Sequence, residues 1–540
     1  MAFFDLTEVY GLDVKQYLKI ARDGVSRILS VKSARGVSFA LAVMSSASKP
    51  LGYARTLIIA WTFGTSPGID AYHLAAGIIS LFAGSVGQAL ESAVLPELIR
   101  IKKETDSWET CRCMAAFISS LVLLGTVIFA AALAAAPGVI VRFFARGFDS
   151  ERIAMGAVTL WWLIPFAAVT MFKPMLDIWA NFTERYTLPA AISTIFNFIA
   201  IPLMLVSIRF IGVYSAAFSM SAAHGAVFFL TLAAMGGVPV FWRRRDMLWN
   251  SVISIARGSL YTTAIAASSA MYVIVDRYFA SMLPSGSVAA ISYAALLIGV
   301  MASVVSMPAV FFLSRMSGLA LDDAEEAVSA MKKTAALSMA YLIPVSAFTA
   351  VLSKPVIAMV FGWGSFDSRS VEMTATCLSS YSIGFSFSVG AAFMYRYAQA
   401  RRRLGTIVIL SYVLVMVNAV LDWALTAKWG LLGLTLATSF TQILGFAAYY
   451  LAVVGGDFPK YIMRMKFFEQ ILLSGLFAYG AHLAGTYGHG AQIAASAVLF
   501  VLCLACAEKL RLMPEVPAGW RPFQLSKFLR SALKSYLGAK

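Results

Sequence analysis

The stretch PGVIVRFFARGFDSE at residues 137–151 has a second version, KPVIAMVFGWGSFDSR, at residues 354–369. Each contains a proline, a Val-Ile pair, a phenylalanine, a glycine and then Phe-Asp-Ser. The two prolines are 218 residues apart, and the same separation links Gly212 of GVYSAAFSMS to Gly430 of GLLGLTLATS. In a membrane chain, two related halves are the usual build of a secondary transporter, with the substrate site between them. The repeat therefore predicts two related lobes.

Composition indicates that the chain is a helical membrane protein. Of its 540 residues, 60% are hydrophobic and 13% are charged, and the mean hydropathy is +0.78. Nearly uncharged segments of about twenty residues recur along the chain, which is the length that a helix needs to cross a bilayer. Residues 1–36 are mixed and charged and lack the apolar core of a cleavable signal peptide. We predict an all-α polytopic membrane protein.

We expect about fourteen transmembrane helices, each long enough to cross the bilayer. They lie near residues 37–62, 70–95, 112–135, 154–180, 187–208, 212–235, 257–283, 288–313, 334–353, 372–398, 405–426, 430–453, 467–485 and 491–508. Crossings 1–6 and 7–12 form two six-helix lobes related by pseudo-two-fold symmetry about the membrane normal. Crossings 13 and 14 are additions to this repeat.

The crossings divide the chain into five regions. These are an amphipathic cytoplasmic segment (1–36), a first lobe (37–240), a second lobe (250–455), the last two crossings (460–510) and a basic amphipathic cytoplasmic tail (511–540). Residues 13–30 of the first segment are expected to form an amphipathic helix before the first crossing, and residues 521–538 of the tail are expected to lie on the inner membrane surface. Partial disorder is the alternative for both.

The net charge of +16 follows the positive-inside rule. Basic clusters such as Arg100 to Lys103, Arg243 to Arg245 and Arg401 to Arg403 lie in every second loop, and the intervening loops carry few charges. This distribution argues against nucleic acid as a partner. It predicts a multi-pass protein of the bacterial inner membrane, with both termini in the cytoplasm and basic loops against phospholipid headgroups.

Two cationic side chains in the first crossing need a physical reason, because a charge at membrane depth costs about 2.5–3.5 kcal/mol on insertion scales. Lys49 and Arg55 point about 120° apart around the helix, and Pro50 can kink it and bring both toward one cavity. Arginine offers a planar fork of donors that suits a phosphate, and lysine offers a point charge. The alternatives are pairing with Asp70 or Glu91, or extension to the membrane surface.

The second lobe contains oxygen-bearing side chains instead. Asp276, Asp422 and Thr438, on crossings 7, 11 and 12, are expected at similar depths in the outer half of the membrane. Asn418 lies four residues before Asp422 and therefore on the same helix face. Carboxylate, amide and hydroxyl oxygens suit a small hard cation. The alternatives are an ion pair between Asp276 and an arginine, and a solvated Asp422 near the interface.

Other polar and sulfur-containing pairs have simpler explanations. Lys173 and Asp177 are four residues apart and predict an ion pair within one helix. Cys503 and Cys506 lie in an apolar helix without histidine neighbours, so packing is favoured over a zinc or redox role. The chain contains no G-x-x-x-x-G-K-[ST] phosphate loop, which argues against ATP hydrolysis.

An ordered set of segments resembles the lipid II flippase (MurJ/MviN) family of the multidrug/oligosaccharidyl-lipid/polysaccharide exporter superfamily. These segments are SKPLGYAR (48–55), FGTSPGIDAYHLA (63–75), VLPEL (94–98), ERYTLPA (184–190), VDRYFASMLPSGSVAAISYA (275–294), KPVIAMVFGWGSFDS (354–368) and GLLGLTLATS (430–439). They follow the family order through crossings 1 to 12.

The resemblance implies a fourteen-helix fold with a central cavity and a lipid-tail groove at crossings 13 and 14. It implies a flippase, not an enzyme, that exports a polyprenyl-diphosphate-linked saccharide such as lipid II. The implied substrate contacts are Arg55, Lys49, Ser48 and Asp70. Lys49 stands where the family pattern has an arginine.

Two further departures concern the cargo. The family arginine of the second helix is absent at Phe82 or Ala83, and that of the eighth helix is absent at Leu296. The cavity is therefore expected to be less basic than that of typical members, and the identity of the glycan stays open.

The resemblance also implies a sodium site. Some family members bind Na⁺ through an Asp on helix 7, an Asn-x-x-x-Asp on helix 11, and a carbonyl and a threonine on helix 12. The corresponding positions are Asp276, Asn418, Asp422, the Leu434 carbonyl and Thr438. H⁺ is the competing coupling ion, and no other cofactor is expected.

Three other functions make different demands on the sequence. A multidrug or small-molecule exporter of the same superfamily should have an acidic or aromatic cavity. A membrane enzyme of lipid-linked glycan assembly should have a long outer loop with catalytic side chains. A scaffold without transport should tolerate loss of the cavity charges. The expected partners are the lipid-linked saccharide and phospholipid, and we expect a monomer, alone or with the cell-envelope synthesis machinery.

Overall fold

The computed structural model describes residues 34–235, 248–303, 324–401, 403–456, 458–464, 466–510 and 512. Within these ranges the chain is helical and forms no strand. The predicted amphipathic segment at 1–36 and the predicted tail at 511–540 lie almost wholly outside the described residues. The predicted all-α fold class is confirmed.

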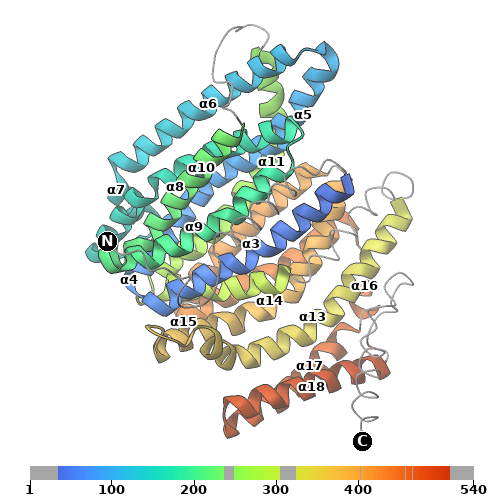
Figure 1. Ribbon diagram of the computed structural model, residues 1–540. Coiled ribbons are helices and arrows are strands. Elements are labelled where there is room, and N and C mark those ends of the chain that lie inside the picture. The colour runs from blue at the N-terminus through green and yellow to red at the C-terminus, as the bar shows by residue number, and fades with distance from the viewer. Residues whose placement is uncertain are drawn as a thin grey trace, which may run out of the picture. The chain divides into compact units, whose positions relative to one another are not determined.

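Where the structure describes the connections, most helices follow one another after short turns (Figure 1). In chain order they are α3 (Ala34–Phe63), α4 (Pro67–Ile79), the π-helix η1 (Ser80–Gly84), α5 (Ser85–Thr105), α6 (Trp108–Ala135), α7 (Pro137–Phe144), α8 (Ser150–Phe182), α9 (Thr187–Ile211), η2 (Gly212–Tyr214), α10 (Ser215–Met235), α11 (Leu248–Ser281), the helix Ser287–Ser303, α13 (Ala324–Phe361), α14 (Ser368–Ala400), α15 (Leu404–Val453), α16 (Phe458–Arg464), α17 (Phe467–Ala484), η3 (Gly485–Tyr487) and α18 (His489–Lys509).

Nine continuous segments of the described chain are long and apolar enough to cross a membrane. Thr187–Met235 and Leu404–Val453 each hold two of the predicted crossings, and the other seven hold one each. The remaining predicted crossings coincide with α3, with the helix Ser287–Ser303 and with α17. Every predicted crossing is therefore helical over the residues that the structure describes, which for the crossing at 288–313 end at Ser303, and the chain is a multi-pass membrane protein.

The sequence repeat is also a repeat of backbone conformation. Gly212 has φ 54° and ψ −129°, and Gly430 has φ 57° and ψ −130°. Other residues rarely adopt this conformation, so glycine permits the chain to turn there between two crossings. One turn separates α9 from α10, and the other divides α15 into two helical halves.

The repeated Phe-Asp-Ser sequences begin corresponding helices. Asp149 Oδ1 accepts the N–H of Arg152 at 2.9 Å at the start of α8. Asp367 Oδ1 accepts the N–H of Ser370 at 2.8 Å at the start of α14. The first N–H groups of a helix have no partner within it, and an aspartate at this position satisfies one of them. The repeated motif is therefore a pair of helix N-caps.

Contacts divide the described residues into two compact units. Unit 1 comprises the described residues up to 58 together with 79–140 and 156–266, and unit 2 comprises 59–78, 141–155 and the described residues from 267 onward. This grouping by contacts differs from the predicted lobes, 37–240 and 250–455, which follow the repeat and stay a prediction.

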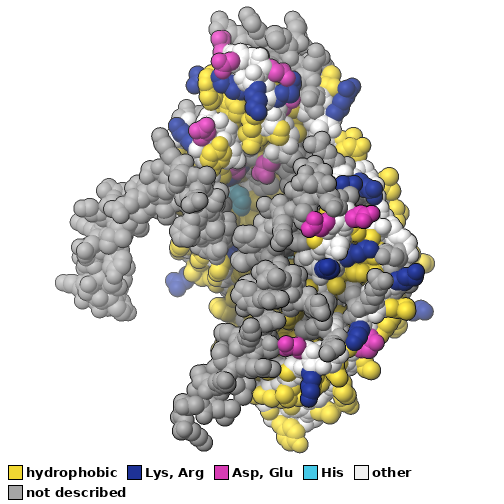
Figure 2. Space-filling model, turned by 90° about the vertical axis from the view of Figure 1, so that its right-hand side faces the viewer, with side chains coloured by type: hydrophobic (Ala, Val, Ile, Leu, Met, Phe, Trp, Pro, Cys, Tyr) yellow, Lys and Arg dark blue, Asp and Glu magenta, His cyan; other side chains and the backbone are white. Residues whose placement is uncertain are grey.

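Unit 1 is built on antiparallel helix pairs. α9 packs on α10 and α5 on α6, and a core that includes Leu98, Met114 and Trp179 joins α5, α6 and α8. Charged side chains gather on the face drawn in Figure 2 at the end where α5 meets α6, where Arg100 pairs with Glu97 at 2.6 Å. Hydrophobic side chains occupy much of the rest of the coloured surface in that view.

In unit 2, α14 packs against both α13 and α15, and α17 and α18 pack on α13. A core of Phe348, Ala478, Ala481 and Cys503 holds these last two helices in place. The predicted packing role of Cys503 is confirmed. The last two predicted crossings are thus attached to the second half of the chain.

We predict that Asp367→Ala destabilises the protein by about 0.5–2 kcal/mol, because the first turn of α14 loses its cap. Accepting the Ser370 N–H lowers the pKa of Asp367 below its ordinary value of 3.8. The stabilisation is therefore complete above that value and is lost as the pH falls through the lowered pKa. Thermal unfolding of the purified protein at several pH values measures both effects.

The control is Asp367→Asn, because asparagine keeps a capping oxygen but does not titrate. It should unfold near the temperature of the unsubstituted protein and lose less stability in acid. Equal destabilisation by alanine and asparagine would contradict the capping role.

Candidate functional site

Arg55 lies half-buried on α3 in unit 1. Its guanidinium carbon is 5.5 Å from the centre of the Phe196 ring, a cation–π distance, and its Nη1 contacts the sulfur of Met220. Its Nε is buried without a hydrogen-bond partner. Among the described residues of unit 1, no carboxylate forms an ion pair with Arg55, so the predicted alternative of neutralisation by Glu91 is not what this unit contains.

The other predicted groups of α3 lie one to two turns away. Lys49 is exposed, and Pro50 lies inside the helix as expected. The Ser48 carbonyl accepts a hydrogen bond from Asn197 Nδ2 at 3.3 Å, and Asn197 Oδ1 is buried without a partner. Unit 1 thus combines two cationic side chains with polar atoms that have unused hydrogen-bonding capacity.

Asp70 has a different environment from these groups. It belongs to unit 2 and is fully buried, and its carboxylate accepts the N–H groups of Gly286 and Ala289, each at 2.7 Å. These amides lie at the start of the helix Ser287–Ser303, where an anion is favourable. The geometry gives Asp70 a structural role at a helix terminus, and its predicted contact with substrate stays a prediction.

The predicted cation ligands lie together in unit 2. Asn418 Nδ2 donates to Asp276 Oδ1 at 2.7 Å and to Asp422 Oδ2 at 2.8 Å. Thr438 Oγ1 is 3.2 Å from Asp276 Oδ2 and 3.5 Å from the Leu434 carbonyl oxygen. These five residues are all buried. We call them the oxygen cluster.

The oxygen cluster fits a small monovalent cation. Asn418 Oδ1 and Asp422 Oδ1 are buried and have no hydrogen-bond partner. Two carboxylates held this close in a low-dielectric interior need a compensating positive charge. Asp276 forms no ion pair with an arginine in the described residues, and Asp422 is fully buried. Neither an ion pair between Asp276 and an arginine nor a solvated Asp422 therefore describes this cluster.

Arg277 follows Asp276 directly and was not singled out from the sequence. Its Nη1 donates to the His73 carbonyl of α4 at 2.6 Å. A Cβ added at Gly77 would collide with this guanidinium, so the close approach requires a glycine. Arg277 thus ties α11 to residues 59–78 within unit 2. The charged pair Asp276-Arg277 in an apolar helix is visible in the sequence. The partner of Arg277 could not be predicted from it, because a backbone carbonyl is present at every residue.

Lys173 and Asp177 form the predicted ion pair within α8. The Lys173 Nζ lies 2.6 Å and 2.8 Å from the two carboxylate oxygens of Asp177. Each of these partly buried charges is therefore compensated by the other.

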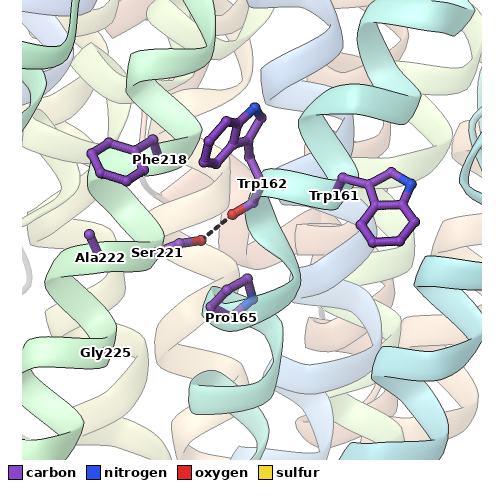
Figure 3. A pocket seen from close by; sticks show the side chains of 7 residues that line it. All are labelled: Trp161, Trp162, Pro165, Phe218, Ser221, Ala222 and Gly225. Carbon is purple, nitrogen blue, oxygen red and sulfur yellow. Dashed lines mark hydrogen bonds between the residues drawn. The ribbon is translucent and has the colours of Figure 1, made fainter. Parts of the chain in front are cut away.

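Each unit contains a cavity between its helices. In unit 1, a cavity of about 620 Å³ between α8 and α10 is walled by Trp162, Pro165, Phe218 and neighbouring apolar groups. Figure 3 shows that the Ser221 hydroxyl there is engaged with the Trp162 carbonyl, at 2.5 Å, whereas Trp161 points away from α10. In unit 2, a cavity of about 350 Å³ has a lining rich in hydroxyl groups.

A doubled set of membrane-crossing helices, with ionisable groups buried inside it, defines a secondary transporter. A family model described as "Lipid II flippase MurJ" matches residues 59–496. The chain belongs to the lipid II flippase MurJ family, and the resemblance noted from its motifs is confirmed.

Curated relatives agree with this assignment. A protein named "Probable lipid II flippase MurJ" from Thermotoga maritima is 24% identical over 430 residues, which cover 79% of this chain and 86% of that protein. The lipid II flippase MurJ of Burkholderia cenocepacia is 23% identical over 453 residues, which cover 80% and 86% of the two chains.

Solved structures agree on the fold. A lipid II flippase MurJ in an inward closed conformation matches 87% of this chain and 99% of its own, with a TM-score of 0.72 and 18% identity. An inward-facing multidrug resistance transporter of the MATE family and MOP superfamily matches 80% and 99%, with a TM-score of 0.64 and 16% identity.

We predict that Gly77→Ala destabilises the protein by about 1–3 kcal/mol, as overpacking of a filled site does. The added methyl group would displace the Arg277 guanidinium from the His73 carbonyl. Thermal unfolding measures the loss. Gly258→Ala on α11 is the control, because nothing lies within 4 Å of a Cβ added there. A Gly77→Ala protein as stable as the Gly258→Ala protein would contradict this interpretation.

Proposed function

We propose that the protein translocates a polyprenyl-diphosphate-linked saccharide, lipid II or a related cell-envelope glycan precursor, by alternating access. The observation that carries the proposal is the half-buried Arg55, which has an unused buried donor and no carboxylate partner among the described residues of unit 1. A planar cation of this kind suits a diphosphate. Family membership supports the cargo class and favours transport over glycan-assembling enzymology.

The diphosphate would be held by Arg55 and Lys49, with Ser48 beside them on α3. The lipid tail would stay in the bilayer along α17 and α18 while the headgroup crosses. A multidrug exporter would require an acidic or aromatic cavity, and the cavity between α8 and α10 does have aromatic walls. The cationic pair and the family membership nevertheless favour a diphosphate-linked cargo over a multidrug substrate.

The departures from the family pattern bear on the saccharide. Phe82 lies in the π-helix η1 with 45% of its surface exposed, and Ala83 beside it is buried. Leu296 lies on the helix Ser287–Ser303. Apolar side chains at these positions reduce the positive charge available to an anionic peptide or sugar. The cargo is therefore expected to carry less negative charge near its saccharide than typical family cargo.

We place the protein in the bacterial inner membrane with both termini in the cytoplasm. The basic loops support this orientation, since cytoplasmic loops carry the excess of Lys and Arg. The same loops would contact anionic phospholipid. We propose that the protein acts as a monomer, alone or beside the cell-envelope synthesis machinery.

We further propose that a cation at the oxygen cluster drives the cycle. The two buried oxygens without partners, on Asn418 and Asp422, support a bound Na⁺, and H⁺ is the alternative ion. The ion would supply positive charge between two carboxylates. One charge moving across 100 mV contributes about 2.3 kcal/mol, which changes a population ratio about fifty-fold.

Arg55→Ala should weaken binding of the lipid-linked diphosphate by roughly 10–150-fold, which corresponds to the loss of about 1.5–3 kcal/mol from a charged hydrogen bond. Lipid II titration with the protein in nanodiscs measures this, and a proteoliposome assay should show the matching loss of translocation. Arg209→Ala is the control, because Arg209 is an exposed arginine in the last turn of α9. Unchanged affinity in Arg55→Ala would refute the assigned substrate contact.

Asp422→Asn should abolish saturable ²²Na⁺ binding, because the amide removes the negative charge that attracts the ion. Asp177→Asn should leave binding unchanged, since Asp177 pairs with Lys173 in unit 1. Binding of ²²Na⁺ that survives Asp422→Asn would refute the proposed ligand. A transport rate that depends on pH and not on Na⁺ would instead identify H⁺ as the coupling ion.

A further inference from the structure

The cavity of unit 2 lies among α11, α14 and both halves of α15. Its volume is about 350 Å³. Its polar lining includes Ser269, Tyr272, Ser388, Ser411, Thr441 and Gln442. The lining also includes Ala391, Leu414, Val415 and Gly445, so the cavity has both polar and apolar walls. A space of this size holds roughly ten waters, since each water occupies about 30 Å³ in the liquid.

The cavity lies on one side of the oxygen cluster along every helix that the two share. Tyr272 precedes Asp276 by one turn of α11, and Ser411 precedes Asn418 by two turns of α15. The lining residues in the second half of α15 follow Thr438. At about 1.5 Å per residue, the lining residues lie roughly 5–16 Å along the helices from the cluster, toward the helix ends at Leu248, Leu404 and Val453.

Tyr272 lies where the cavity meets the cluster. It lines the cavity, and its hydroxyl lies 3.4 Å from the Thr438 carbonyl oxygen, to which it donates. Gln442 Oε1, on the cavity side, is buried and has no hydrogen-bond partner among the described residues. A lining residue of the cavity and the cluster next to it therefore both carry buried oxygens without a hydrogen-bond partner.

The opposite face of α15 is unsuitable for an ion. Ile409, Val413, Met416 and Val420 are exposed and recur every three to four residues, which makes one apolar stripe. A bare ion cannot cross such a face, because its hydration would have no replacement. Asn418 and Asp422 are fully buried, so an ion that reaches them needs a polar route.

We propose that the hydroxyl-lined cavity is the passage by which a small monovalent cation, with part of its water, exchanges between the oxygen cluster and the side of the membrane at Leu248. The Tyr272 hydroxyl separates the passage from the cluster. This proposal rests on the proposed cation coupling, and it assigns the route and the side of exchange.

The first test measures release of ²²Na⁺ from the full-length protein in nanodiscs after dilution into unlabelled Na⁺. Ala391 lines the cavity, and Ala391→Leu should slow release by about tenfold or more, because the added side chain displaces water that would accompany the ion. The equilibrium affinity should change by less than about twofold, since Ala391 is not a ligand.

The matched control is Ala392→Leu, the same change at the next residue of α14, where the side chain is exposed and outside the cavity lining. It should release ²²Na⁺ at the rate of the unsubstituted protein. Equal release rates for all three proteins would overturn the passage. Failure of the unsubstituted protein to bind ²²Na⁺ would refute the cation site itself, which is a different result.

The second test does not require ion binding. In a background lacking the five native cysteines, Ser411→Cys should react with a charged, membrane-impermeant thiol reagent applied to the Leu248 side. Val413→Cys, on the apolar stripe two residues away, should not react. Serine to cysteine is a small change, so the fold should tolerate it. An unreactive Ser411→Cys in a folded protein would also overturn the passage.

Discussion

Two carboxylates buried together in a membrane protein impose the strictest physical requirement in this structure. Asp276 and Asp422 are joined by a single amide group, and each is almost or fully buried. Such a pair is costly unless positive charge or protons compensate it. Unit 2 meets part of the requirement with hydrogen bonds from Asn418 and Thr438. The negative charge that these hydrogen bonds do not compensate would attract a cation to the cluster.

Much of this arrangement could be predicted from the sequence because it depends on periodicity. Apolar length located the crossings, and the i, i+4 spacing of Asn418 and Asp422 placed both on one face. Repeated local chemistry also carried over, since Phe-Asp-Ser proved to be an N-cap and the matched glycines proved to be turns with the same dihedral angles. These features involve residues close together in the chain, so the sequence alone is enough to predict them.

The features that could not be predicted depend on contacts between distant segments. The charge of Asp70 was visible, but its partners are backbone amides more than two hundred residues away, and backbone groups carry no sequence signal. The hydroxyl-lined cavity was missed for a related reason. Serines and threonines in transmembrane helices commonly bond to their own helix, as Thr441 does with the Ala437 carbonyl. Such side chains indicate a cavity only when several helices bring them together, and that arrangement is not visible in the sequence.

The consecutive residues Asp276 and Arg277 join two functions on one helix. Asp276 belongs to the oxygen cluster, whereas Arg277 holds the His73 carbonyl of α4. Neighbouring residues differ in direction by about 100° on a helix, so α11 presents one charge to the cluster and the other to residues 59–78. A cation at the cluster would remove part of the attraction between Asp276 and Arg277, and its departure would restore it. The proposed ion would therefore act on the same helix that anchors α4 in unit 2, without any longer chain of contacts.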